Sequence, residues 1–157
     1  MVLVHTLKKI LILSWFALLL ASCQQSSQFQ LLNGEQKSIS DYQGDWLLIN
    51  FWAEWCPPCL KEIPELNALE AQGIKVIAVS YDKLSNQELL AQKQKYQIEY
   101  QIMATEPMPY LPMERPTGLP ANYLFTPKGQ MIGPLLGKQD QTSILALIEK
   151  IESSQAN

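Results

Sequence analysis

Two cysteines, Cys56 and Cys59, stand three residues apart with a proline pair, Pro57 and Pro58, between them. Thiols at this spacing can close a disulfide with each other, so one can attack a disulfide in another molecule and the second can resolve the mixed disulfide. The attacking species is the thiolate, which a helix N-terminus favours by lowering the cysteine pKa to roughly 3.5–7.5. The pair predicts thiol–disulfide exchange, with Cys56 as nucleophile and Cys59 as the resolving thiol.

The elements around the pair are those that this chemistry requires. The run from 46 to 53 is almost continuously apolar and leads directly to Cys56, a pattern typical of a central strand covered on both faces. Beyond Pro57, apolar residues recur at helical spacing up to Gly73, at Leu60, Ile63, Leu66 and Leu69. Pro64 lies inside this predicted helix, where we expect a kink. Cys56 therefore falls at a strand–helix junction, among unpaired N–H groups.

The rest of the chain alternates between predicted strands and helices, within the size of one domain. Apolar runs predict strands over 74–80, 122–125 and 130–136, and a weaker one near 100–103. Helical patterns cover 86–96 and 142–151. This order predicts an α/β fold with a parallel sheet and a hairpin at 122–136.

Other uses of a Cys-x-x-Cys pair each lack a part in this chain. The single histidine, His5, lies in a segment that we expect to be removed. Zinc would require two further ligands, and haem attachment would require histidine at the position of Leu60. A purely structural disulfide closing so short a loop would stabilise little. No metal site and no cofactor are predicted.

The N-terminal 22 residues have the features of an export signal. Lys8 and Lys9 precede an apolar run, 10–20, that is too short to favour a spanning helix. The sequence Leu20-Ala21-Ser22-Cys23 resembles the bacterial lipoprotein signal, in which the cysteine is acylated and becomes the new N-terminus. We therefore predict a signal peptide over 1–22, a lipid-anchored tether over 23–28 and a folded domain over 29–157. An ordinary signal peptide or an uncleaved anchor, with an incidental cysteine, is the alternative.

Charge and the predicted lipid limit the partners. Removing residues 1–22 takes away two lysines and no acidic residue, which changes the formal net charge from −3 to −5. An acidic body disfavours nucleic acid. Membrane contact is expected through acyl chains on Cys23, several of which are needed for stable anchoring. Gln24 stands where an aspartate often retains lipoproteins in an inner membrane, which favours the outer membrane, on the extracytoplasmic side.

The segment Phe51-Trp52-Ala53-Glu54-Trp55-Cys56-Pro57-Pro58-Cys59, continued by Leu60-Lys61-Glu62-Ile63-Pro64, resembles the active site of the TlpA-like thiol–disulfide oxidoreductases. The resemblance covers 29 to the end of the chain. It implies a thioredoxin-like fold with a central mixed sheet and helices on both faces. It also implies reduction of protein disulfides in the cell envelope, including those of cytochrome c maturation, with a transmembrane thiol donor that recharges the enzyme. The residues leave the direction of electron flow open.

The resemblance extends the site beyond the cysteines. It implies that Pro120 is cis, packs against the cysteines and presents the backbone of Leu119 to an extended substrate peptide. It also implies an acid–base role for Glu62, three residues after Cys59 on the helix. Ordinary thioredoxins have a buried aspartate where this chain has Asn50, and Glu62 is expected to replace it.

Trp55, Pro57 and Pro58 are predicted to form the apolar surface that binds substrate. Glu54 is interpreted as a plain exposed carboxylate. Ala121 and Asn122 stand where the resembled family has Thr or Ser, so substrate hydrogen bonding there stays open.

Two other functions compete with thiol–disulfide exchange. The stretch 103–116 is rich in methionine and proline, with Met103, Met108, Met113, Pro107, Pro109, Pro112 and Pro116. Thioethers bind Cu(I), so a copper-binding or copper-delivery lipoprotein is one alternative. Such methionines more often pack or dock, and we favour a specificity loop beside Pro120. A peroxidase of the peroxiredoxin group is less favoured because its cysteine normally stands alone after a threonine-containing turn.

Overall fold

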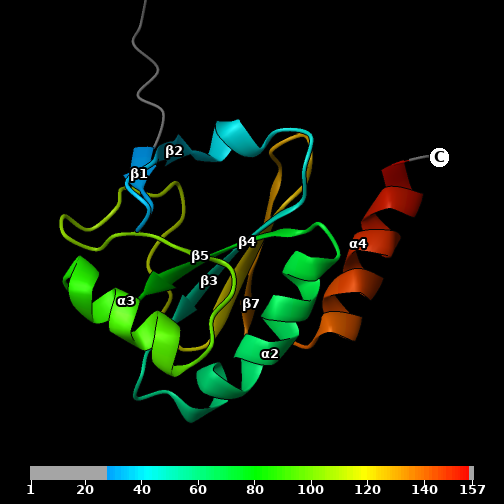
Figure 1. Ribbon diagram of the computed structural model, residues 1–157. Coiled ribbons are helices and arrows are strands. Elements are labelled where there is room, and N and C mark those ends of the chain that lie inside the picture. The colour runs from blue at the N-terminus through cyan, green and yellow to red at the C-terminus, as the bar shows by residue number, and fades with distance from the viewer. Residues whose placement is uncertain (1–27, 156–157) are drawn as a thin grey trace, which may run out of the picture.

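The computed structural model describes residues 28–155 and contains one five-stranded sheet, in the order β5-β4-β3-β6-β7 (Figure 1). Its strands are β3 (Leu47–Trp52), β4 (Lys75–Ser80), β5 (Gln101–Ile102), β6 (Ala121–Phe125) and β7 (Met131–Leu136). β4 pairs in parallel with both β3 and β5, whereas β6 is antiparallel to β3 and β7. The mixed sheet confirms the predicted thioredoxin-like α/β fold.

The central strand β3 delivers the chain to the cysteines. All six of its residues are buried, as its nearly continuous apolar sequence predicted. Leu48 and Trp52 face one core cluster, and Leu47, Ile49 and Phe51 face another on the opposite side of the sheet. β3 is therefore a central strand that is covered on both faces.

Among residues 28–155, three α-helices follow the predicted order: α2 (Pro57–Ala71), α3 (Asn86–Lys95) and α4 (Gln141–Gln155). The prediction of helices on both faces is wrong, because buried residues of all three helices, such as Leu66, Leu89 and Ile144, belong to one core cluster. The steps β3-α2-β4 and β4-α3-β5 run in the same direction across the sheet. Right-handed crossovers then place α2 and α3 on the same face.

The opposite face is covered by short elements and irregular chain. The hairpin of β1 (Gln28–Gln30) and β2 (Gln36–Ser38) and the 3₁₀-helix η1 (Ile39–Tyr42) lie across it, at the top of Figure 1. Phe29, Leu31, Met103 and Met113 pack against the sheet there. We call this the helix-free face, since none of α2, α3 and α4 contributes to its core cluster among the described residues.

The element boundaries agree closely with the sequence. β1 begins at Gln28, one residue before the predicted start of the domain, and α2 continues through Pro64 to Ala71. The predicted signal peptide and Cys23 lie outside the described residues. Within 28–155, no helix has the length and apolar content to cross a membrane.

Candidate active site

Cys56 and Cys59 form a disulfide at the N-terminus of α2. β3 ends at Trp52 and α2 begins at Pro57, so Cys56 is the capping residue, and its Sγ accepts a hydrogen bond from the Cys59 amide at 3.3 Å. This placement confirms the predicted strand–helix junction. After reduction, the same amide and the helix N-terminus would stabilise a thiolate on Cys56.

Access to the two sulfurs is restricted in this oxidised state. Cys56 is 5% exposed and Cys59 is 1% exposed. Cys59 lies on the buried side of α2, in the same core cluster as Ile63 and Leu66. The more exposed cysteine is therefore the predicted nucleophile, and the more buried one is the predicted resolving thiol.

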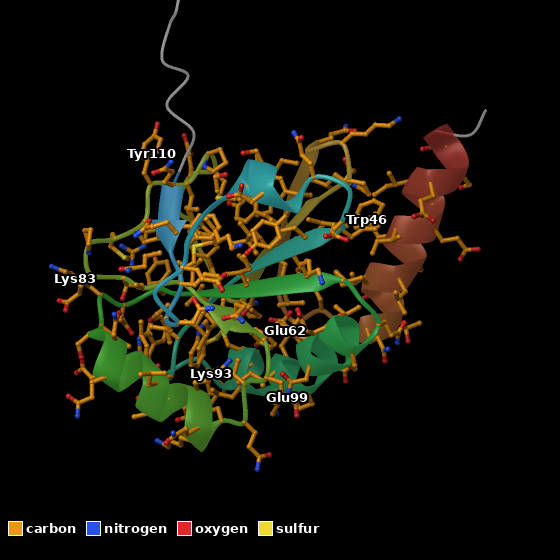
Figure 2. All side chains as sticks on the ribbon, turned by 45° about the horizontal axis from the view of Figure 1, so that its top comes forward. Trp46, Glu62, Lys83, Lys93, Glu99 and Tyr110 are labelled. Atoms are coloured by element: carbon orange, nitrogen blue, oxygen red, sulfur yellow. A yellow bond between two sulfur atoms is a disulfide. The ribbon has the colours of Figure 1, made fainter. Side chains whose placement is uncertain are left out.

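Glu62, one helical turn beyond Cys59, is completely buried between α2 and the sheet (Figure 2). Its Oε1 accepts from Asn122 Nδ2 at 2.8 Å and from the Gln139 amide at 2.7 Å, and its Oε2 accepts from Asn50 Nδ2 at 3.0 Å. Burial raises the pKa of the Glu62 carboxyl, and the three hydrogen bonds and Lys138 offset this only in part. Glu62 is therefore a buried carboxyl on α2 that can bind and release a proton.

Asn50 and Asn122 hold this carboxylate as a pair. They are register partners on β3 and β6, and Asn50 Nδ2 also donates to Asn122 Oδ1 at 2.9 Å. Asn122 is the residue whose departure from the resembled family had no explanation in the sequence. Sequence reasoning missed its role, although a buried amide in each of two apolar strands was the available signal. Gln139 contributes through its backbone amide, so the identity of its side chain gave no signal in the sequence.

Pro120 adopts the conformation that the resemblance implied. The Leu119–Pro120 peptide bond is cis and Pro120 is buried immediately before β6. Leu119 is half-buried and packs against the core clusters of both faces. Substrate contact through the Leu119 backbone stays a prediction.

Trp55 provides an exposed apolar surface beside Cys56. Its side chain is 62% exposed, and its indole N–H donates to Asp82 Oδ2 at 2.7 Å. The Trp55 ring also lies edge-on to Tyr81, with centroids 6.3 Å apart. Pro57 and Pro58 are exposed at the start of α2. The position of these three residues fits the predicted substrate-binding surface.

Glu54 is exposed, as predicted, but its interpretation as a plain carboxylate is wrong because it has three hydrogen-bond donors on and next to α3. Its Oε1 accepts from Lys95 Nζ and Tyr96 Oη, each at 2.7 Å, and its Oε2 accepts from Gln92 Nε2 at 3.1 Å. The hydrogen bonds from Lys95 and Tyr96 lower the pKa of Glu54. They attach the loop that carries Trp55 to α3.

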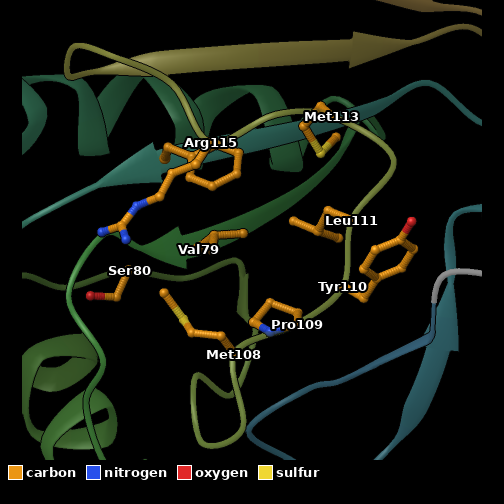
Figure 3. Close-up of a pocket in the computed structure, with 9 residues that line it drawn as sticks. Val79, Ser80, Met108, Pro109, Tyr110, Leu111, Met113 and Arg115 are labelled. Carbon is orange, nitrogen blue, oxygen red and sulfur yellow. The ribbon is translucent and has the colours of Figure 1, made fainter.

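The methionines of 103–116 do not converge on one point. Met103 and Met113 are buried in the core of the helix-free face. Met108 and Met113 lie at opposite ends of a pocket, with Leu111 and Val79 between them (Figure 3). This arrangement favours packing over a shared thioether site.

Comparisons with known proteins agree with this geometry. A model of the AhpC/TSA family matches residues 23–131. The thiol–disulfide oxidoreductase ResA of Bacillus cereus is 25% identical over 124 residues, which cover 76% of this chain and 71% of the relative. The exposed lipoprotein thioredoxin of Streptococcus pneumoniae strain TIGR4 aligns with a TM-score of 0.63 at 15% identity, over 80% of this chain and 98% of that one. A DsbF homologue from Corynebacterium diphtheriae aligns with a TM-score of 0.66 at 17% identity, over 80% and 85%.

The thioredoxin-like fold, the disulfide at the helix N-terminus and the similarity to ResA define a thiol–disulfide oxidoreductase. The chain belongs to the AhpC/TSA family. The two structural alignments lie below 25% identity and support the fold alone.

The buried carboxyl predicts a pH dependence of stability that Glu62→Gln should remove. Because burial raises the Glu62 pKa, the folded protein binds this proton more tightly than the unfolded chain. The stabilising contribution is present below the unfolded pKa, about 4.3, and is lost as the pH rises through the folded pKa. The lowered pKa values of Asp41, Glu54, Glu88 and Asp140 act in the opposite direction, so the measurement is a difference. In urea unfolding above about pH 4.3, the stability of the wild type relative to Glu62→Gln should fall as the pH rises.

Glu65→Gln is the matched control. Glu65 lies on the same helix, is half-buried and accepts from the Gln141 amide at 3.2 Å. This variant should keep the wild-type pH dependence. Parallel curves for Glu62→Gln and the wild type would show that Glu62 has no raised pKa.

Proposed function

We propose that the protein is a lipid-anchored, TlpA-like enzyme that reduces disulfides in exported proteins. The observation that carries this proposal is the Cys56–Cys59 disulfide at the N-terminus of α2, beside the exposed Trp55. The names of the relatives, an oxidoreductase and a lipoprotein thioredoxin, support it. Proteins of cytochrome c maturation are candidate substrates.

The proposed exchange with the substrate uses the two cysteines and one proton acceptor, and an external thiol donor closes the cycle. The Cys56 thiolate attacks one sulfur of the substrate disulfide, and the other substrate sulfur leaves as a thiolate. Cys59 then loses its proton and attacks Cys56 Sγ, so the mixed disulfide breaks and the Cys56–Cys59 bond forms. Two electrons have passed to the substrate. A transmembrane thiol donor would return them to the enzyme.

Glu62 is the proposed acceptor of the Cys59 proton. It lies three residues after Cys59 on the same helix, and both residues are buried. A carboxyl with a raised pKa can take up and release a proton closer to neutral pH than an exposed one. Asn50 and Asn122 would then keep this acceptor in a fixed position.

Cys59→Ala should convert the enzyme into a trap. Without the resolving thiol, mixed disulfides between Cys56 and its substrates should accumulate as adducts that a reducing agent releases, and insulin-disulfide reduction should be lost. Electrophoresis of cell-envelope proteins with and without reductant measures the adducts. The control is Cys56→Ala/Cys59→Ala, which should capture nothing. Identical patterns in both variants would contradict exchange at Cys56, and stoichiometric Cu(I) binding without insulin reduction would favour the copper alternative.

The direction of electron flow predicts a reduction potential. A reductase should have a potential below that of protein disulfide isomerase, which is about −180 mV. Equilibration of the Cys56–Cys59 pair with glutathione buffers measures it. A value near the −120 mV that is typical of strong envelope oxidases, about 60 mV higher, would overturn the reductase assignment.

Anchoring through Cys23 predicts a change in fractionation. Cys23→Ser should move the protein from the membrane fraction to the soluble fraction of the envelope, because the acylated thiol is lost. Ser26→Ala, in the same polar segment, should stay with the membrane. Density separation of the two membranes tests the expected outer-membrane location. Membrane retention of Cys23→Ser would contradict lipid anchoring at this residue.

A further inference from the structure

A pocket of about 350 Å³ lies on the helix-free face, where 108–115 crosses the carboxyl ends of β3 and β4 (Figure 3). This volume falls in the range of pockets that bind ligands, roughly 300–1,000 Å³. The walls are largely apolar, with Phe51 and Val79 from the strands and Met108, Leu111 and Met113 from the crossing segment. The proposed reaction uses none of these side chains.

Among the described residues, Arg115 is the only positively charged residue that lines the pocket. Its guanidinium lies over the Tyr81 ring at 3.7 Å and donates to the Tyr81 carbonyl. Figure 3 shows the side chain extending toward the end of β4. Arg115 is exposed, and no carboxylate among residues 28–155 forms an ion pair with it. Its remaining N–H groups can bind a carboxylate in the paired geometry that guanidinium favours.

Tyr81 connects this pocket to the redox pair. One contact of the Tyr81 ring is with Arg115, and another is with Trp55, the residue before Cys56. The two distances, 3.7 Å and 6.3 Å, place the guanidinium within about 10 Å of the Trp55 ring. An extended chain advances about 3.3 Å per residue, so roughly three residues cover this distance.

We infer that the pocket docks an extended segment of the protein substrate, taking up an apolar side chain while Arg115 pairs with an adjacent Asp or Glu. The inference rests on the proposed reduction of protein disulfides. The docked residues would lie roughly three or four positions from the substrate cysteine that Cys56 attacks. Exposed apolar side chains at the rim, Met108 at 39% and Tyr110 at 75%, extend the same surface. Methionine adapts to side chains of different shape, which suits an enzyme with several substrates.

The test compares two disulfide-linked peptides that differ by one charge. In both peptides the test position lies four residues from the cysteine and has Leu beside it. One peptide has Glu at the test position and the other has Gln. Reduced wild-type enzyme should show a KM about tenfold lower for the Glu peptide. Arg115→Gln should remove this difference, and Arg115→Lys should restore part of it. Raised salt should reduce the wild-type preference.

Two controls make the result specific. Lys128→Gln removes an exposed positive charge from the β6–β7 turn and should retain the tenfold preference. A small disulfide without a peptide reports whether each variant folds and exchanges. Equal KM values for the two peptides in the wild type, with the small disulfide reduced, would overturn the docking site alone. Failure of the wild type to reduce any of the three substrates would overturn the proposed function and the docking site together.

Discussion

The buried carboxylate of Glu62 joins the parts of the molecule that must act together. A buried charge is costly unless hydrogen bonds satisfy it, and here the donors come from β3, β6 and the segment that leads into α4. Glu62 itself belongs to α2, the helix of the cysteines. Loss of one donor would leave charge unsatisfied in the core. The position of α2 against the sheet, and therefore of Cys59, depends on this set of contacts.

The direction of the strand connections determines how the helix-free face of the sheet is covered. Since β3, β4 and β5 follow one another outward in the sheet, the helices between them share one face. The opposite face must still be covered, and the β1–β2 hairpin with 103–116 covers it. Irregular chain packs less uniformly than a helix, and a pocket lies under it at the carboxyl ends of β3 and β4. These ends are also where the cysteine loop begins.

The sequence predicted local features well because they depend on near neighbours. The apolar run of β3, the helical spacing of α2 and the placement of Cys56 between them follow from residues close in the chain. The contact of Asn122 with Asn50, 72 positions away, follows from strand order and register. The contact of Arg115 with Tyr81, 34 positions away, follows from the path of the irregular segment across the sheet. Periodicity contains no such information. The helix face was mispredicted for the same reason, because sheet order decides it.

The two faces of the sheet therefore have different proposed roles, with disulfide exchange on the helix side and substrate recognition on the helix-free side. On the helix side, Cys59 and Glu62 are buried in the core, where a substitution alters packing, charge and redox chemistry together. On the helix-free side, Arg115 and Met108 are exposed, and surface substitutions there usually change stability by less than about 0.5 kcal/mol. Recognition could thus vary among related chains without disturbing the exchange reaction. Tyr81 packs against the helix-side core, and its ring contacts both Arg115 and Trp55, so a segment docked at Arg115 would lie near Cys56.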